Sequence, residues 1–142
     1  MVSRLFGTIL LGALMAHPAF PGDADTAQPA QSVQSSEAPS ISAAELHARR
    51  EAMTAPVVID VRTAGEYETG HIPGALNIPF DEVAERIAEV ETPNGVALYC
   101  MIGPRARKGE SALLATGYQK VFHLEGGLAA WKAAGLPVEG AQ

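Results

Sequence analysis

Cysteine is almost absent from the chain of 142 residues, in which Cys100 is the only one. A single cysteine excludes an internal disulfide and any metal site built from several thiolates. Basic residues form no cluster longer than RARK, and the net charge is −6. This excludes the broad basic face that nucleic-acid binding requires. The partners that remain are small anions and other proteins.

The chain also lacks a long hydrophobic run. Its most apolar stretch is residues 5–16, which follow Arg4. This stretch is too short to span a bilayer comfortably, and small residues follow it, so we predict a secretory signal peptide over residues 1–24. The alternatives are cleavage after Ala19 and an uncleaved membrane anchor. After cleavage we expect a periplasmic or secreted protein with no stable membrane association.

Large apolar residues are scarce between residues 21 and 40, which consist mainly of Ala, Gln, Ser, Pro and acidic residues. Such a segment cannot bury enough apolar surface to offset the entropy lost on ordering. We therefore predict a flexible linker over residues 25–40 and one folded domain over residues 41–138.

Within the predicted domain, helical and strand patterns alternate. Short apolar runs predict strands at residues 57–61, 75–78, 96–99 and 120–124. Apolar spacing and terminal Ser, Pro and Gly residues predict helices at residues 41–53, 80–90, 104–117 and 126–135. Ser42 and Glu45 have the spacing of a capping box at the first helix. The alternation predicts an α/β domain with a mostly parallel sheet flanked by helices.

Cys100 lies in the sequence LYCMIGPRAR, directly after the predicted strand at residues 96–99. Ligands bind at the carboxyl ends of strands in such sheets. A turn from Cys100 into a helix gathers backbone N–H groups into an anion-binding concavity, and Gly103 permits the backbone shape required. The helix dipole and Arg105 would favour the nucleophilic thiolate. The alternative is that Cys100 only fills the core.

Three segments together resemble a known family. They are residues 57–80 (VVIDVRTAGEYETGHIPGALNIPF), 98–106 (LYCMIGPRA) and 117–138 (GYQKVFHLEGGLAAWKAAGLPV). The chain resembles single-domain rhodaneses, which are thiosulfate sulfurtransferases. With its predicted signal peptide it is similar to the small exported rhodaneses of the phage-shock type. The resemblance implies a five-stranded parallel sheet with helices on both faces and a loop that holds a cysteine persulfide.

The resemblance implies that Cys100 is the catalytic residue of a two-step transfer. Cys100 would take a sulfur atom from thiosulfate or a related anionic donor and pass it to cyanide or to a thiol, a protein thiol included. No cofactor is implied. The substrate-binding residues implied by the resemblance are Met101, Ile102, Gly103, Arg105 and Ala106.

Alternative functions remain open. A non-enzymatic sulfur carrier would present the Cys100 persulfide to a partner protein. A phosphate-ester or arsenate hydrolase is disfavoured, because the four residues between Cys100 and Arg105 make a shorter loop than that of protein phosphatases with this fold. Pro104 provides no N–H group to the loop. Because Met101 and Ile102 are apolar, a sulfur donor that is larger or less charged than thiosulfate is also compatible with this loop.

Other polar residues receive mainly structural interpretations. Asp60 and Arg62 either orient the cysteine loop or secure the turn after their strand, and we favour the second role. His71 resembles the turn histidine of the family and is interpreted as a turn-stabilising residue. His47 and His123 lack the spacing of metal ligands, so no metal site is predicted. The pair Gly126–Gly127 permits a tight entry into the last helix and lacks the pattern of a phosphate loop.

Overall fold

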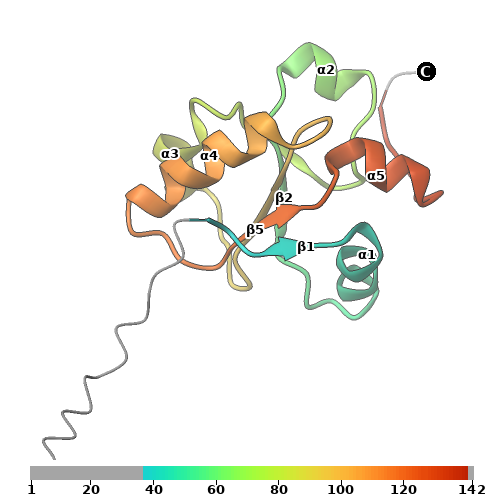
Figure 1. Ribbon diagram of the computed structural model, residues 1–142, viewed down its shortest axis with the longest axis horizontal. Coiled ribbons are helices and arrows are strands. Elements are labelled where there is room, and N and C mark those ends of the chain that lie inside the picture. The colour runs from blue at the N-terminus through green and yellow to red at the C-terminus, as the bar shows by residue number, and fades with distance from the viewer. Residues whose placement is uncertain (1–36, 141–142) are drawn as a thin grey trace, which may run out of the picture. The chain divides into compact units, whose positions relative to one another are not determined.

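Five parallel strands form the centre of the structure, a computed structural model that describes residues 37–140 (Figure 1). The order across the sheet is β1-β5-β4-β2-β3, and every neighbouring pair is parallel. The strands are β1 (Ser40–Ile41), β2 (Val57–Asp60), β3 (Leu76–Asn77), β4 (Val96–Tyr99) and β5 (Val121–Leu124). The predicted five-stranded α/β fold is confirmed.

Helices cover both faces of the sheet. In Figure 1, α3 and α4 lie on one side of the strands, while α1 and α5 lie on the other. The helical elements are α1 (Ala43–Glu51), α2 (Ala64–Glu68), α3 (Val83–Arg86), the 3₁₀ turn η1 (Ile87–Glu89), α4 (Pro104–Ala115) and α5 (Gly127–Ala133). The helices α1, α4 and α5 begin and end within two residues of the predicted helices.

The central strand β4 is buried on both faces, as its unbroken apolar sequence requires. Side chains alternate along a strand. Val96 and Leu98 therefore pack in the core under α3 and α4, whereas Ala97 and Tyr99 pack in the core with α1 and α5. Cys100 continues the first of these series. The alternation thus places the thiol on the face that α4 covers.

Three elements differ from the prediction. The short helix α2 lies outside the four predicted helix ranges. The helix predicted at residues 80–90 is divided into α3 and η1, because the backbone tightens to i→i+3 hydrogen bonding after Arg86. Val83 and Ile87 nevertheless remain buried at helical spacing. Strand β1 was not predicted, since two residues are too few to show a period.

The capping box predicted at Ser42 is only half formed. The Ser42 hydroxyl accepts the N–H of Glu45 at 3.1 Å, but the Glu45 carboxylate binds Arg49 at 2.6 Å instead of returning to the cap. A complete capping box is found at α2, between Thr63 and Glu66. That second box bears on the candidate site.

The predicted signal peptide, and the predicted linker up to residue 36, lie outside the described residues. The last residues of the predicted linker contact the domain: Ala38 is buried and Ser40 begins β1. At the other end, Glu139 pairs with His71 in an isolated antiparallel bridge. Contacts of the domain therefore extend slightly beyond both predicted boundaries. None of the helices within residues 37–140 has the length and apolar character needed to cross a membrane.

Candidate active site

Cys100 lies directly after β4, at the carboxyl end of the strand next to β2 and β5. The sequence predicted this position. The residue is only 1% exposed, so it lies at the floor of the loop and belongs to the core as well. Its Sγ accepts the backbone N–H of Gly103 at 3.1 Å. The thiol is therefore both packed in the core and hydrogen-bonded to the loop, and its catalytic role stays a prediction.

Gly103 shapes the turn between Cys100 and α4. Its φ of 128° is a conformation that residues with a side chain rarely adopt. It is the N-cap of α4, and Pro104 is the first residue of that helix. Proline suits this position because the first N–H groups of a helix have no partner within it. Pro104 therefore lacks an N–H group at a position where the helix does not require one. The N–H groups of Arg105 and Ala106 follow it.

The carbonyl groups of the cysteine loop are bound by α5. Leu128 donates its N–H to the Cys100 oxygen at 2.9 Å, and Ala129 donates to the Met101 oxygen at 3.0 Å. Gly127 makes this approach possible, because a Cβ there would lie 2.5 Å from the Cys100 oxygen. The sequence indicated only a tight helix entry at this glycine pair and gave no sign of its contact with the cysteine loop. No local pattern signals a contact between segments so far apart in the chain.

The predicted substrate-binding residues differ in exposure. Ile102 is 67% exposed and Met101 is 38% exposed, so both present apolar surface beside the buried thiol. Gly103 is buried, and the Ala106 side chain is fully buried in the core below the loop. Ala106 can therefore reach a ligand only with its backbone. The roles of these residues in binding stay predictions.

Arg105 is held by Glu66. Its two terminal nitrogens donate to the two Glu66 carboxylate oxygens at 2.7 and 2.8 Å. The hydrogen bonds from Arg105 lower the pKa of Glu66 to about 2. They also raise the pKa of Arg105, to which nearby Cys100 contributes in the same direction. The predicted contact of Arg105 with an anionic donor stays a prediction, and the structure adds that a carboxylate already occupies this guanidinium.

Local structure fixes Glu66 in place for this ion pair. Thr63 accepts the N–H of Glu66, and Glu66 Oε2 accepts both the N–H and the hydroxyl of Thr63. The spacing Thr-x-x-Glu is visible in the sequence and signals the cap. Nothing in the sequence pairs Glu66 with Arg105, 39 residues away. The partner of Arg105 was therefore not predicted.

Asp60 and Arg62 form a buried ion pair at the end of β2. Arg62 Nη2 lies 2.6 Å from Asp60 Oδ2 and also donates to the Gly70 oxygen at 2.7 Å. Asn77 donates to the backbone oxygens of both residues. Within residues 37–140, these bonds join the pair to Gly70 and to Asn77 of β3 and not to the cysteine loop. The role of the pair as a scaffold stays a prediction.

The histidines have structural surroundings. His71 Nδ1 lies 2.8 Å from the Tyr67 oxygen, and its ring stacks on Tyr67 at 3.6 Å between centroids. These contacts fit the turn-stabilising role. In the described part of the chain, no three His, Cys, Asp or Glu side chains lie together as a metal site would need. His123 belongs to a buried pair treated below.

Comparisons with known proteins agree with this architecture. The rhodanese-like domain family matches residues 42–134. An HTH-type transcriptional regulator of Mycobacterium tuberculosis is 41% identical over 117 residues, which cover 82% of this chain and 51% of the regulator. A sulfurtransferase of Allochromatium vinosum is 35% identical over 82 residues, which cover 58% of this chain and 77% of that protein. This chain thus spans about half the length of the regulator and most of the sulfurtransferase.

Solved structures show the same fold. The rhodanese-like domain of an Anabaena protein superposes with a TM-score of 0.66 at 33% identity, covering 72% of this chain and 80% of that one. A rhodanese-related protein from Thermoplasma volcanium gives a TM-score of 0.62 at 31% identity, covering 71% of this chain and 97% of that one. The similarity includes β4, the cysteine loop and α4, which lie within the matched residues 42–134.

Proposed function

The chain belongs to the rhodanese-like domain family, and on this premise we propose that it is an exported sulfurtransferase that carries a sulfane sulfur on Cys100. The family and the sulfurtransferase relative support sulfurtransferase activity in general. The observation that carries the assignment to Cys100 is the hydrogen bond of 3.1 Å from the Gly103 N–H to its Sγ, at the start of the 12-residue helix α4. Amide donors and the positive end of a helix stabilise a sulfur anion.

The proposed reaction has two displacement steps. The Cys100 thiolate attacks the outer sulfur of thiosulfate, a new S–S bond forms, and sulfite leaves with the electron pair of the broken bond. Cyanide or a thiolate then attacks the outer sulfur of the persulfide and restores the Cys100 thiolate. Each step exchanges one bond at sulfur, so no external oxidant or reductant is needed.

The donor belongs to the proposal as well. Thiosulfate would have to share Arg105 with Glu66, which already binds the guanidinium through two hydrogen bonds. Met101 and Ile102 offer apolar surface beside the thiol. These features support a donor that is larger or less charged than thiosulfate, such as an organic persulfide, in addition to thiosulfate itself.

Thiocyanate formation from thiosulfate and cyanide tests the proposed activity. Because Cys100 is the only cysteine, Cys100→Ser removes every thiol from the chain in one conservative step. We expect this variant to keep its fold and to retain less than about a tenth of the wild-type rate. A folded serine variant with a higher rate would remove Cys100 from the mechanism.

A persulfide-presenting carrier is the second candidate, and the exposed Ile102 favours it, because an apolar side chain beside the thiol suits a protein partner. Turnover separates the two candidates. An enzyme forms many equivalents of thiocyanate, whereas a carrier without its partner forms one equivalent and stops.

Export is supported by the sequence alone, through Arg4 and the apolar residues 5–16. Cell fractionation and the N-terminal mass of the protein test this part of the proposal. We expect the protein outside the cytoplasm, beginning after Ala24 or Ala19. A full-length cytoplasmic protein would contradict export without affecting the assignment of Cys100.

A further inference from the structure

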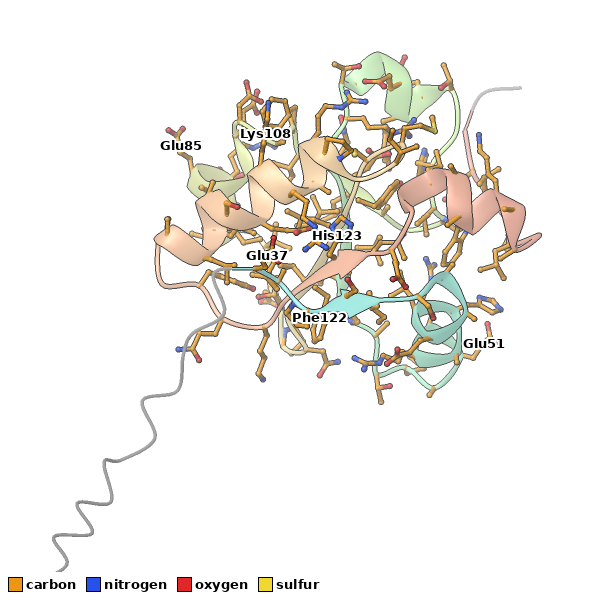
Figure 2. The ribbon with its side chains drawn as sticks, viewed as in Figure 1. Glu37, Glu51, Glu85, Lys108, Phe122 and His123 are labelled. Atoms are coloured by element: carbon orange, nitrogen blue, oxygen red, sulfur yellow. The ribbon has the colours of Figure 1, made fainter. Side chains whose placement is uncertain are left out.

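Two buried titratable side chains, His123 and Glu110, are hydrogen-bonded to each other between α4 and β5. His123 Nδ1 is 2.6 Å from Glu110 Oε1, and the two side chains are 7% and 2% exposed. His123 comes from β5 and Glu110 from α4, so the pair bridges the sheet and the helix that begins at the loop. Figure 2 shows the labelled His123 between the ribbons of α4 and β5. Burying two titratable side chains costs desolvation free energy, which their mutual hydrogen bond and any further role must offset.

The Cε1–Nε2 edge of the His123 ring faces Gly103. A Cβ at Gly103 would lie 3.4 Å from both Cε1 and Nε2 of His123. Gly103 is the residue whose N–H donates to Cys100 Sγ. Glu110 therefore binds His123, the His123 ring lies next to Gly103, and Gly103 binds the thiol. Nε2, the ring nitrogen that Glu110 does not bind, is on the edge of the ring nearest to Gly103.

The charged groups around His123 define its electrostatic setting. From α4 it faces Glu110, whose second carboxylate oxygen lies 3.4 Å from Arg107 Nη1. From the loop after β4 it faces Gly103 and, beyond that residue, Cys100. Towards β1 its backbone N–H binds the Pro39 oxygen, and Glu37 there is exposed. Burial raises the pKa of Glu110, and the hydrogen bond with His123 opposes this effect.

We propose that the Glu110–His123 pair is a positioning device for the cysteine loop, in which Glu110 fixes the His123 ring under Gly103 and a proton on that ring stabilises the thiolate of Cys100. The His123 ring lies beside Gly103, and its positive charge would act on the sulfur across that residue. Glu110 acts only through His123. The inference concerns the ionisation of the thiol, so it can be tested without any sulfur-transfer assay.

Thiolate absorbance in the ultraviolet, titrated against pH on the full chain, is the direct test. With Cys100 as the only cysteine, the signal reports on one sulfur, and Cys100→Ser supplies the baseline. In Glu110→Gln, which keeps the size of the side chain but loses its charge, we expect the midpoint of the thiolate titration to rise by about half a pH unit or more. Thermal unfolding of the same samples shows that the variant is folded.

Glu85→Gln is the matched control. It removes the same charge from an exposed glutamate of α3, which points away from the molecule (Figure 2). We expect its thiolate titration to coincide with that of the wild type. An unchanged midpoint in folded Glu110→Gln, or an equal shift in both variants, would overturn the proposal.

A second measurement needs no change in the pair. Coupling is reciprocal, so the Cys100 thiolate must favour the proton on His123 as much as that proton favours the thiolate. We expect the His123 imidazole signals in nuclear magnetic resonance to titrate at lower pH in Cys100→Ser than in the wild type. Identical His123 titrations in the two proteins would show that the pair only supports the fold, and the proposal would fail.

Discussion

Arg105 carries the cation nearest to the candidate nucleophile in sequence, yet its guanidinium is bound by Glu66 in a two-bond ion pair. The side chains of Arg105 and Glu66 are 32% and 37% exposed, so the pair is open to solvent and to an incoming anion. A donor that displaces Glu66 would gain the guanidinium but would leave the carboxylate to water. With the proposed role of Arg105, selectivity for anionic donors would depend on both residues, of which Arg105 stands in the first turn of α4.

Arg105→Ala should raise the KM for thiosulfate more than the KM for a sulfane donor that carries no negative charge. If a charged hydrogen bond to the donor is made, the difference is about 1.5 kcal/mol or more, which is roughly tenfold in KM. Glu66→Gln should lower the KM for thiosulfate, because the guanidinium loses its competing partner. Steady-state kinetics with both donors provide the measurement. Equal effects on the two donors would contradict a role of Arg105 in binding the anion.

The contribution of the Glu66–Arg105 ion pair to the stability of the fold should decrease as the pH falls. The pKa of Glu66 is lowered to about 2 in the folded protein by its hydrogen bonds with Arg105. A group with a depressed pKa stabilises the fold at pH values above its unfolded pKa and loses this contribution as the pH falls through the folded value. We expect the difference in unfolding free energy between wild type and Glu66→Gln to be constant above about pH 5, and to disappear towards pH 2.

Urea unfolding at a series of pH values measures this difference. Because both side chains are about one-third exposed, we expect it to amount to less than about 1 kcal/mol. A difference that increases as the pH falls from 5 to 2 would contradict the assigned ion pair.

At the scale of elements, the cysteine loop is held between the end of β4, the start of α4 and the start of α5. The hydrogen bonds from Leu128 and Ala129 turn the loop carbonyls towards α5, which leaves loop amides for the sulfur. The close approach of α5 depends on Gly127, whose φ is 56°. The shape of the loop is therefore set by a helix that follows it by more than twenty residues in the sequence.

Gly127→Ala should disturb the loop more than its own helix. The new Cβ would lie within 3 Å of backbone atoms of Cys100 and Met101, and backbone cannot move aside easily. We expect a loss of about 2–4 kcal/mol in unfolding free energy and a slower sulfur transfer. Thermal unfolding and steady-state rates measure the two effects.

Gly135→Ala is the control for Gly127→Ala. Gly135 has a similar φ of 71°, but nothing lies within 4 Å of the position that a Cβ would take there. It should lose about 1 kcal/mol from backbone strain and keep its activity. Equal losses of activity in the two variants would contradict the contact between α5 and the loop.

Much of this arrangement could be predicted from local sequence patterns. The apolar runs of β2, β4 and β5 identify the strands, and their alternation with helices gives the parallel sheet. Cys100, Gly103 and Pro104 lie within five residues of one another in the sequence, so their turn into α4 was also predictable.

Tertiary contacts account for what the sequence did not reveal. The bonds of Glu66 with Arg105, of α5 with the loop, and of Glu110 with His123 join segments that meet only after folding. No spacing rule describes them. The division of α3 and η1 and the two-residue β1 were missed because such short elements are stabilised by packing rather than by a sequence period.

At the scale of the whole molecule, the buried Asp60–Arg62 pair connects the sheet to the segment that follows it. Asp60→Ala would leave the fully buried Arg62 guanidinium without its carboxylate. We expect a loss of about 3–5 kcal/mol in unfolding free energy, because an uncompensated buried charge is costly. Chemical denaturation measures the loss.

Glu45→Ala is the matched control, since it breaks the exposed ion pair with Arg49 on α1. Exposed pairs of this spacing contribute about 0.5 kcal/mol or less. Comparable losses in Asp60→Ala and Glu45→Ala would show that the buried pair does not stabilise the domain as described.

The mass of the intact protein after incubation with thiosulfate or an organic persulfide shows whether Cys100 carries a sulfane sulfur. We expect the addition of one sulfur atom, located on the peptide that contains Cys100 and removed by cyanide as thiocyanate. An unchanged mass with every sulfane donor, or a sulfur that cyanide cannot remove, would contradict this expectation.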